Sequence, residues 1–315
     1  MAQVSLPPVS INPSSMVSCC SDSVEWECPP LFSDSDGDAQ ESGCATQPSS
    51  TVVLKPSVYD FGGHVVTLLP VPLADLKDAA SVSSQVWRGS LVLARALMQF
   101  KHRIAGANVL ELGTGRGLCG LLAVELGARQ MVFTDCSWTC LKVLLPNVPG
   151  HADGPRCSSG WGEGDDRCLI RRHLWESDLP RSPGRGPPRH WSNWPQCTWG
   201  PQGAPPELEA DMTVEVVIGA DLLYFPSQVD PLLATLSLRL ALGGLALLTV
   251  TVRTRAVYIG FLEKLGQFGL VVESEGVVDV DALDEHHLET RSPAEEFVHD
   301  TRNAQEVRLL LLARA

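Results

Sequence analysis

The sequence lacks the marks of a zinc-binding, secreted or membrane-spanning protein. Its ten cysteines form no C-x-x-C pair and none has zinc-ligand spacing with a histidine, so we expect reduced, intracellular thiols and no metal site. The N-terminus has neither the basic region nor the apolar core of a signal peptide. The longest apolar run, residues 240–252, contains a glycine pair and is too short to cross a bilayer. We therefore expect a cytoplasmic or nuclear location, or both, and no membrane contact.

Basic residues are also scarce. The chain has 24 Lys and Arg against 37 Asp and Glu, which gives a formal net charge of -13. Broad binding to a phosphate backbone needs clustered basic side chains, so nucleic acid is not an expected partner. An acidic surface suits a basic protein segment instead. We expect the protein to be a monomer.

Composition divides the chain into a tail and one domain. Residues 1–50 are rich in Ser and Pro and cannot bury enough apolar surface to fold, so they are predicted to be a disordered tail. Residues 51–315 form the domain. Within it, residues 178–211 are rich in Pro, Gly, Arg and Trp and are predicted to be a disordered insertion. Their interleaved arginines and tryptophans could also stack on single-stranded nucleic acid, but the prolines favour a mobile insertion.

The hydrophobic pattern alternates between strands and helices. Residues 51–54 and 64–68 predict a β-hairpin with a turn at 59–63. Further strands are predicted at 109–112, 131–134, 168–174, 214–219, 245–252, 270–273 and 307–312. Helices are predicted at 118–126, 231–242 and 255–265, with another after residue 87 and mostly loop at 273–300. Such alternation predicts a doubly wound α/β sheet.

The stretch that organises the domain is residues 109–117, a buried strand that runs into a glycine-rich turn and a helix. Gly113, Gly115 and Gly117 let the backbone turn tightly and approach a ligand closely, because no Cβ intervenes. Glu111 is the one carboxylate in the strand. This pattern predicts a site for a nucleotide-type cofactor.

Two cofactors compete for that site. Gly115, Gly117 and Gly120 fit the dinucleotide fingerprint, with Asp135 at roughly the expected offset. However, Glu111 would repel a pyrophosphate. S-adenosylmethionine has no phosphate and carries a cationic ammonium and sulfonium, which suit a carboxylate. Asp135 can accept hydrogen bonds from the ribose hydroxyls of either cofactor.

Four polar or aromatic residues follow predicted strands: Glu111, Asp135, Trp175 and Asp221. Ligands of doubly wound sheets bind beyond the carboxyl ends of the strands, so these residues are expected to converge on one rim. Trp87 lies near the start of a helix. It is either a core anchor or a wall of the cofactor pocket.

With these residues in hand, the chain resembles the seven-β-strand class of S-adenosylmethionine-dependent methyltransferases, and more narrowly the family 16 protein-lysine methyltransferases. Residues 86–89 look most like the methyltransferase-like protein 22 branch. The residues that carry the resemblance are Val86-Trp87, the turn from Glu111 to Gly117, Asp135, Leu174-Trp175 and Asp221-Leu222-Leu223-Tyr224, which is similar to the family's D-x-x-Y motif. Pro146 departs from the family pattern and leaves the role of Asn147 open.

The resemblance implies a doubly wound, seven-stranded, mostly parallel sheet with helices on both faces and a small N-terminal β extension. It also implies methyl transfer from S-adenosylmethionine to a lysine in a basic segment of a protein substrate. Asp221 and Tyr224 would line the acceptor channel as catalytic residues. The implied cofactor-binding residues are Trp87, Glu111, Gly113, Thr114, Gly115, Gly117, Asp135 and Trp175.

Three other functions stay open. The protein could methylate RNA or a small molecule, in which case the insertion's arginines and tryptophans are the feature to test. It could be a non-catalytic binding protein on the same fold, although intact Glu111, Asp135 and Asp221 argue against lost cofactor binding. It could also be a nicotinamide oxidoreductase, as the dinucleotide fingerprint suggests.

Overall fold

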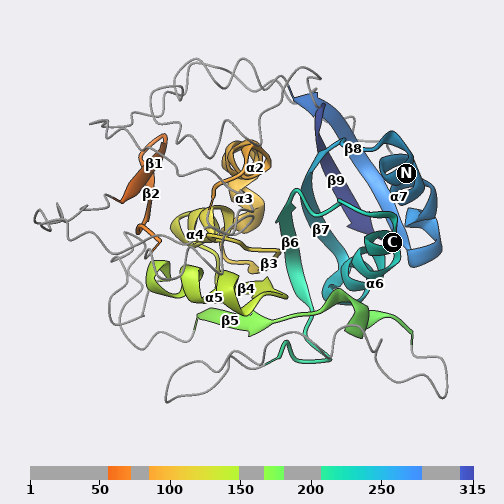
Figure 1. Ribbon diagram of the computed structural model, residues 1–315, viewed down its shortest axis with the longest axis horizontal. Helices are drawn as coiled ribbons and strands as arrows, with labels where there is room; N and C mark the ends of the chain where they lie inside the picture. The colour runs from red at the N-terminus through yellow and green to blue at the C-terminus, as the bar shows by residue number, and fades with distance from the viewer. Residues whose placement is uncertain (1–55, 72–84, 149–166, 181–206, 279–305) are drawn as a thin grey trace, which may run out of the picture.

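The computed structural model describes residues 56–71, 85–148, 167–180, 207–278 and 306–315 (Figure 1). The predicted tail at 1–50 and the predicted strand at 51–54 lie outside the described residues, as do residues 181–206 of the insertion. The domain boundaries therefore stay predictions.

The core of the protein is a seven-stranded sheet in the order β5-β4-β3-β6-β7-β9-β8. Each neighbouring pair from β5 to β7 is parallel, whereas β9 runs antiparallel to both β7 and β8. This arrangement confirms the predicted mostly parallel, doubly wound sheet. The strands are β3 Asn108–Leu112, β4 Gln130–Asp135, β5 Cys168–Arg172, β6 Val214–Ala220, β7 Leu240–Thr251, β8 Leu270–Val278 and β9 Val307–Arg314.

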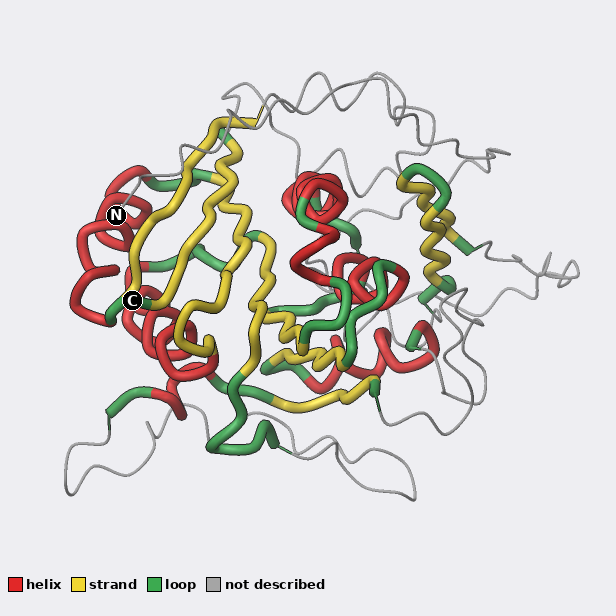
Figure 2. The backbone as a smooth tube through the Cα atoms, turned by 180° about the vertical axis from the view of Figure 1, so that it is seen from behind, coloured by secondary structure: helices red, strands yellow, loops and turns green. Residues whose placement is uncertain are grey.

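Helices cover both faces of the sheet (Figures 1 and 2). The helices α2, α3, α4 and α5 lie on one side, and α6 and α7 lie on the other. None of the described helices is long and apolar enough to cross a membrane. Their bounds are α2 Arg88–Gln99, α3 Lys101–Ile104, α4 Leu118–Glu125, α5 Trp138–Leu144, α6 Val229–Arg239 and α7 Arg255–Lys264, with 3-10 turns η1 Leu145–Asn147, η2 Trp175–Asp178, η4 Pro226–Gln228 and η5 Leu265–Phe268.

The sheet is buried on both faces because successive strand side chains point to opposite sides. In β3, Val109 belongs to the core cluster that includes Leu93 and Leu122, whereas Leu110 belongs to the cluster that includes Leu232. Glu111 therefore points to the same face as Val109, toward the helices on the α4 side.

The predicted N-terminal β extension is confirmed as a hairpin of β1 Ser57–Phe61 and β2 His64–Leu68. Its turn is shorter than predicted: Phe61 pairs with His64, so only Gly62 and Gly63 form the turn. Both glycines have positive φ angles, 65° and 93°, which a two-residue hairpin turn requires. The prediction of a turn at 59–63 was therefore wrong for residues 59–61, which are in the strand.

The strand β7 begins earlier than predicted. Residues 240–242 were predicted to end a helix, but α6 ends at Arg239 and β7 runs through Gly243 and Gly244. The pairing with β6 shifts between Val214, opposite Leu240, and Val216, opposite Leu245. The glycine pair therefore forms an irregularity within a strand, with Gly243 at φ 72°, and does not end a helix.

One further boundary differs from the prediction. The strand β8 continues to Val278, where acidic residues had predicted loop from residue 273. Its pairing with β9 reaches Val307, so backbone hydrogen bonds to a buried neighbour overrule local composition here. Residues 279–305 lie outside the described residues.

A buried ionic network holds both ends of the predicted insertion against α6. Arg239 pairs with Asp178 through two hydrogen bonds and also donates to the backbone carbonyls of Glu209 and Ala210. His173 Nε2 lies 2.9 Å from Asp178 Oδ2. Burial alone would raise the pKa of Asp178, but hydrogen bonds from His173 and Arg239 hold it at about 2. One side chain of α6 thus fixes both flanks of residues 181–206.

We predict that Arg239→Met destabilises the protein by about 3–5 kcal/mol, because it leaves the Asp178 carboxylate buried without its main partner. Urea unfolding measures the change. The matched control is Lys264→Met, which breaks the exposed pair with Asp230 and should cost less than about 1 kcal/mol. Equal effects of the two variants would show that the network does not hold this part of the fold.

Candidate functional site

The predicted site residues come from the carboxyl ends of four adjacent parallel strands. Asp135 is the last residue of β4, Trp175 begins η2 after β5, and Asp221 follows β6. Glu111 is the penultimate residue of β3. The strand order therefore brings these residues to one edge of the sheet, as predicted (Figure 1). Within the described ranges, no group of three His, Cys, Asp or Glu side chains could hold a metal ion.

The glycine turn between β3 and α4 depends on left-handed backbone conformations. Gly113, Gly115 and Gly117 have φ angles of 62°, 49° and 81°. The Thr114 N–H donates to the carbonyl of Thr134 at the end of β4, and the Gly117 N–H donates to the carbonyl of Thr114. Residues with a Cβ rarely adopt such conformations, so glycine is the natural residue at all three positions.

The space around the three glycines differs. A Cβ on Gly117 would lie 2.3 Å from Leu144 Cδ1, and one on Gly113 would lie 2.9 Å from Leu222 Cδ2. A Cβ on Gly115 would meet no atom within 4 Å. Gly113 and Gly117 are thus required by packing, whereas Gly115 faces open space that a ligand could occupy.

Glu111 is a buried carboxylate beneath this turn, with 4% of its surface exposed. Its Oε2 accepts a hydrogen bond from Thr114 Oγ1 at 2.6 Å. The pKa of Glu111 is raised to about 8, mainly by burial and also by the charge of Asp135, against hydrogen bonds from Thr114 and the Gly120 backbone. Among the described residues no Lys, Arg or His forms an ion pair with it. A cationic group at the turn would stabilise this carboxylate.

Asp135 links the glycine turn to the start of α5. Its Oδ2 accepts from the Gly115 N–H at 3.3 Å and its Oδ1 accepts from the Ser137 N–H at 2.9 Å. Burial raises the pKa of Asp135 despite these bonds. Ser137 caps α5, because its side chain accepts from the Cys140 N–H. The two acids expected at the cofactor site are therefore joined through the turn itself.

Asp221 is the one non-glycine residue of the described chain with a positive φ angle, 54°. It is buried, its N–H donates to the Thr249 carbonyl, and its Oδ1 accepts from the Thr251 N–H at 2.9 Å. A Cβ on Gly89 would lie 2.6 Å from Asp221 Oδ2, so the carboxylate packs against the first turn of α2. Strained backbone of this kind persists where neighbours hold it, and it clusters at functional sites.

The three aromatic candidates lie around the same edge. Tyr224 is half-buried, and its pKa is raised by burial and by the charge of Asp221. Trp87 is half-buried and immediately precedes α2, two residues before Gly89. Trp175 packs against the core cluster on the α6 side. Their contacts fit core packing as well as pocket walls, so their cofactor and acceptor roles stay predictions.

Two residues that contribute to this region were missed or left open by the sequence. Arg253 follows β7 and lies over the ring of Tyr224; its position after a core strand was a signal that could have identified it. Asn147 is fully buried, and its Oδ1 accepts from the Leu69 N–H at 2.7 Å. Arg116 of the glycine turn donates to the carbonyl of the same Leu69. Asn147 and Arg116 thus both bind the backbone of Leu69, in the segment after β2.

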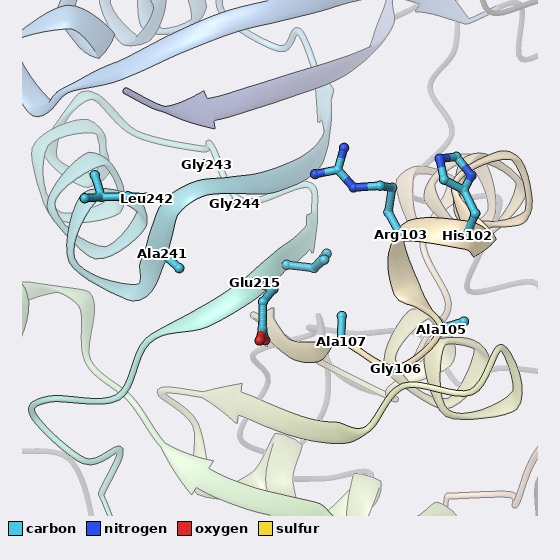
Figure 3. A pocket seen from close by; sticks show the side chains of 11 residues that line it. His102, Arg103, Ala105, Gly106, Ala107, Glu215, Ala241, Leu242, Gly243 and Gly244 are labelled. Atoms are coloured by element: carbon cyan, nitrogen blue, oxygen red, sulfur yellow. The ribbon is translucent and has the colours of Figure 1, made fainter.

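A separate pocket lies at the opposite edge of the sheet (Figure 3). Its volume is about 380 Å³, and its lining includes Ala107 just before β3, Glu215 at the start of β6 and the glycine pair of β7. These positions are at the amino ends of β3 and β6. The pocket is therefore distinct from the edge that carries Glu111, Asp135 and Asp221.

Comparison with known proteins finds similarity over part of this edge. Residues 73–153 match the lysine methyltransferase family model. The match confirms the resemblance to that family. It spans α2, the glycine turn and Asp135, and it ends before β6, so Asp221, Tyr224 and Arg253 lie outside it.

Three relatives show how far the similarity extends. Histidine protein methyltransferase 1 homolog of Bos taurus is 37% identical over 69 residues, which are 22% of this chain and 18% of that protein. Methyltransferase-like protein 22 of Homo sapiens is 36% identical over 67 residues, 21% of this chain and 16% of that protein. Histone-arginine methyltransferase METTL23 of Xenopus laevis is 26% identical over 150 residues, 48% of each.

These relatives share only part of their length with the chain. The chain spans 18% and 16% of the first two and 48% of the third. Two of the three names state an acceptor residue, histidine in one and arginine in the other. The similarity therefore supports methyltransferase ancestry and does not choose the acceptor.

We predict different consequences for alanine at two of the glycines. Gly117→Ala should destabilise the protein by about 2–5 kcal/mol, because it adds left-handed strain and overlap with Leu144. Gly115→Ala should cost only about 1–2 kcal/mol, because its Cβ enters open space. Urea unfolding measures both changes.

The Gly115→Ala variant also tests whether a ligand approaches the turn. Gly115→Ala should fold but lose affinity for S-adenosylhomocysteine in a thermal-shift titration, because the Cβ takes up space that the ligand needs. Undiminished affinity in this variant would mean that the ligand does not approach Gly115.

Proposed function

We propose that this protein is an S-adenosylmethionine-dependent N-methyltransferase that acts on a protein side chain, with lysine as the acceptor. The observation that carries the proposal is the buried Glu111 carboxylate, with no ion-pair partner among the described residues, beneath a glycine turn that also binds Asp135. A pyrophosphate at this turn would face two carboxylates, whereas a cationic ligand would be stabilised by them. The family match over residues 73–153 supports the same cofactor.

The residues present fit this cofactor. Glu111 and the turn at Gly113, Gly115 and Gly117 would hold its cationic methionine end, with Thr114 fixing the carboxylate. Asp135 would accept hydrogen bonds from the ribose hydroxyls, and Trp87 and Trp175 would line the pocket. When bound, S-adenosylmethionine supplies an electrophilic methyl group, which passes to the acceptor nitrogen as the carbon–sulfur bond breaks. The protein mainly supplies alignment and exclusion of water.

The acceptor side is formed by Asp221 and Tyr224. A lysine amine must be neutral to attack, and desolvation disfavours the ammonium form. Tyr224, half-buried beside Asp221, would orient the nitrogen lone pair by a hydrogen bond. Asp221, fixed by the Thr251 N–H, would position the acceptor nitrogen. The net negative charge of the chain supports a basic protein segment as the partner.

Histidine is the second candidate acceptor. The relative from Bos taurus, a histidine protein methyltransferase 1 homolog, is as similar to the chain over its matched segment as methyltransferase-like protein 22 is. An imidazole is largely neutral at physiological pH, so it would need less desolvation than an amine. Hydrolysis and amino-acid analysis of labelled protein distinguish methyl-lysine from methyl-histidine.

Ligand binding separates this proposal from the oxidoreductase alternative. A thermal-shift titration should show stabilisation by S-adenosylhomocysteine and none by NAD. Stabilisation by NAD alone would overturn the transferase proposal.

We predict that the protein transfers labelled methyl groups to protein in a cell lysate, and that treatment with protease but not RNase removes the label. Asp221→Asn should abolish the transfer yet keep S-adenosylhomocysteine binding, because asparagine tolerates the left-handed backbone and keeps the shape of the side chain. Loss of binding together with transfer would mean that Asp221 acts on the cofactor or the fold. Label in nucleic acid alone would exclude a protein substrate.

We further predict that binding of S-adenosylmethionine releases a proton from Glu111. The pKa of Glu111 is raised to about 8, so near neutral pH this side chain is mostly protonated without ligand. A bound cation favours the carboxylate and lowers its pKa, so affinity should rise roughly tenfold per pH unit below that value. Calorimetry in buffers of different ionisation enthalpy measures the proton. Glu111→Gln should remove both effects, and their persistence would assign them elsewhere.

A further inference from the structure

Arg253 places a permanent positive charge at the acceptor side of the site. It lies two residues after Thr251, the last residue of β7, and its N–H donates to the carbonyl of Thr251. Its guanidinium carbon lies 4.4 Å from the centroid of the Tyr224 ring. Arginine over an aromatic face is held by a cation–π interaction, so the guanidinium and the ring form one unit.

The same guanidinium faces Asp221 without a hydrogen bond to it. Arg253 Nη1 lies 3.6 Å from Asp221 Oδ1, which is beyond hydrogen-bond length, while that oxygen already accepts from the Thr251 N–H. Nη1 is buried and has no hydrogen-bond partner among the described residues. The guanidinium is therefore held beside Asp221 by charge and not by a hydrogen bond, and one of its donors has no hydrogen-bond partner in the described chain.

Other charged groups near this unit are few in the described chain. Arg88 begins α2 beside Gly89, which packs against Asp221. The carbonyl of Glu306 accepts from the Val252 N–H, and its carboxylate pairs with Arg308. Arg255 begins α7 and is exposed. Asp221 is thus the carboxylate that faces Arg253 in the structure.

We propose that Arg253 is a specificity-determining residue that makes the acceptor site favour a neutral nitrogen over an ammonium. This inference rests on the proposed N-methyltransferase function. With Asp221 already faced by a guanidinium, an incoming ammonium gains little from the carboxylate and is repelled by the nearby cation. A lysine would therefore lose its proton more readily in the complex, and an imidazole would enter unprotonated.

The test is the pH dependence of single-turnover methyl transfer. Excess protein and labelled S-adenosylmethionine are mixed with RNase-treated lysate protein, so that the rate reports the acceptor's pKa in the complex. Arg253→Gln should move the midpoint to higher pH by about one to two units, because a like charge near the acceptor is removed. Arg253→Lys keeps the positive charge and should move this midpoint far less.

Arg255→Gln is the matched control, because it removes the same charge two residues away at an exposed position. It should leave the midpoint unchanged. An Arg253→Gln variant that is slower by one factor at every pH would overturn the inference and leave a structural role. If the wild-type chain labels no protein in the lysate, the proposed function is overturned, and this inference with it.

A second readout does not depend on activity. Burial and the charge of Asp221 raise the pKa of Tyr224, whereas the charge of Arg253 lowers it. Arg253→Gln should therefore raise the pKa of this phenol in a tyrosinate absorbance titration. The chain has three tyrosines, and Tyr224→Phe identifies the one that moves. An unchanged titration would mean that the guanidinium does not act electrostatically on the site.

Discussion

Three left-handed glycines between β3 and α4 set the geometry of the ligand edge. Gly113, Gly115 and Gly117 bring the end of the first core strand directly into a helix, while Thr114 ties the turn to the end of β4. Because the turn is this tight, Glu111 lies beneath it and Asp135 reaches it by a hydrogen bond. The turn, the two acids and the start of α4 therefore form one unit, and a change in any part displaces the others.

Burial acts on both acids of that unit, and a cationic ligand would stabilise their charged forms. Burial raises the pKa values of both Glu111 and Asp135, since neither carboxylate has a cation to balance it among the described residues. Burial thus favours the neutral form of each acid, whereas a cationic ligand would favour the carboxylate and would stabilise the folded protein by binding to it. The same reasoning explains why the turn suits a phosphate-free cofactor.

The family match covers only one of the two parts of this sheet edge. The family match covers residues 73–153, which carry the glycine turn and Asp135. The half proposed to receive the acceptor is built from residues after β6 and β7, where Asp221, Tyr224 and Arg253 meet. A relative whose name states histidine is 37% identical to this chain over its matched segment, and one whose name states no acceptor residue is 36% identical. We therefore propose that local charges in this half choose the acceptor.

The sequence by itself determined the alternation of strands and helices, the glycine turn and the edge on which its acids gather, because these follow from local periodicity and from glycine's backbone freedom. Only the tertiary structure decided that β7 begins at Leu240, that Arg239 holds both flanks of the insertion, and that Arg253 faces Asp221. Each of these depends on pairing or burial between residues far apart in the chain, and no local pattern encodes such a contact.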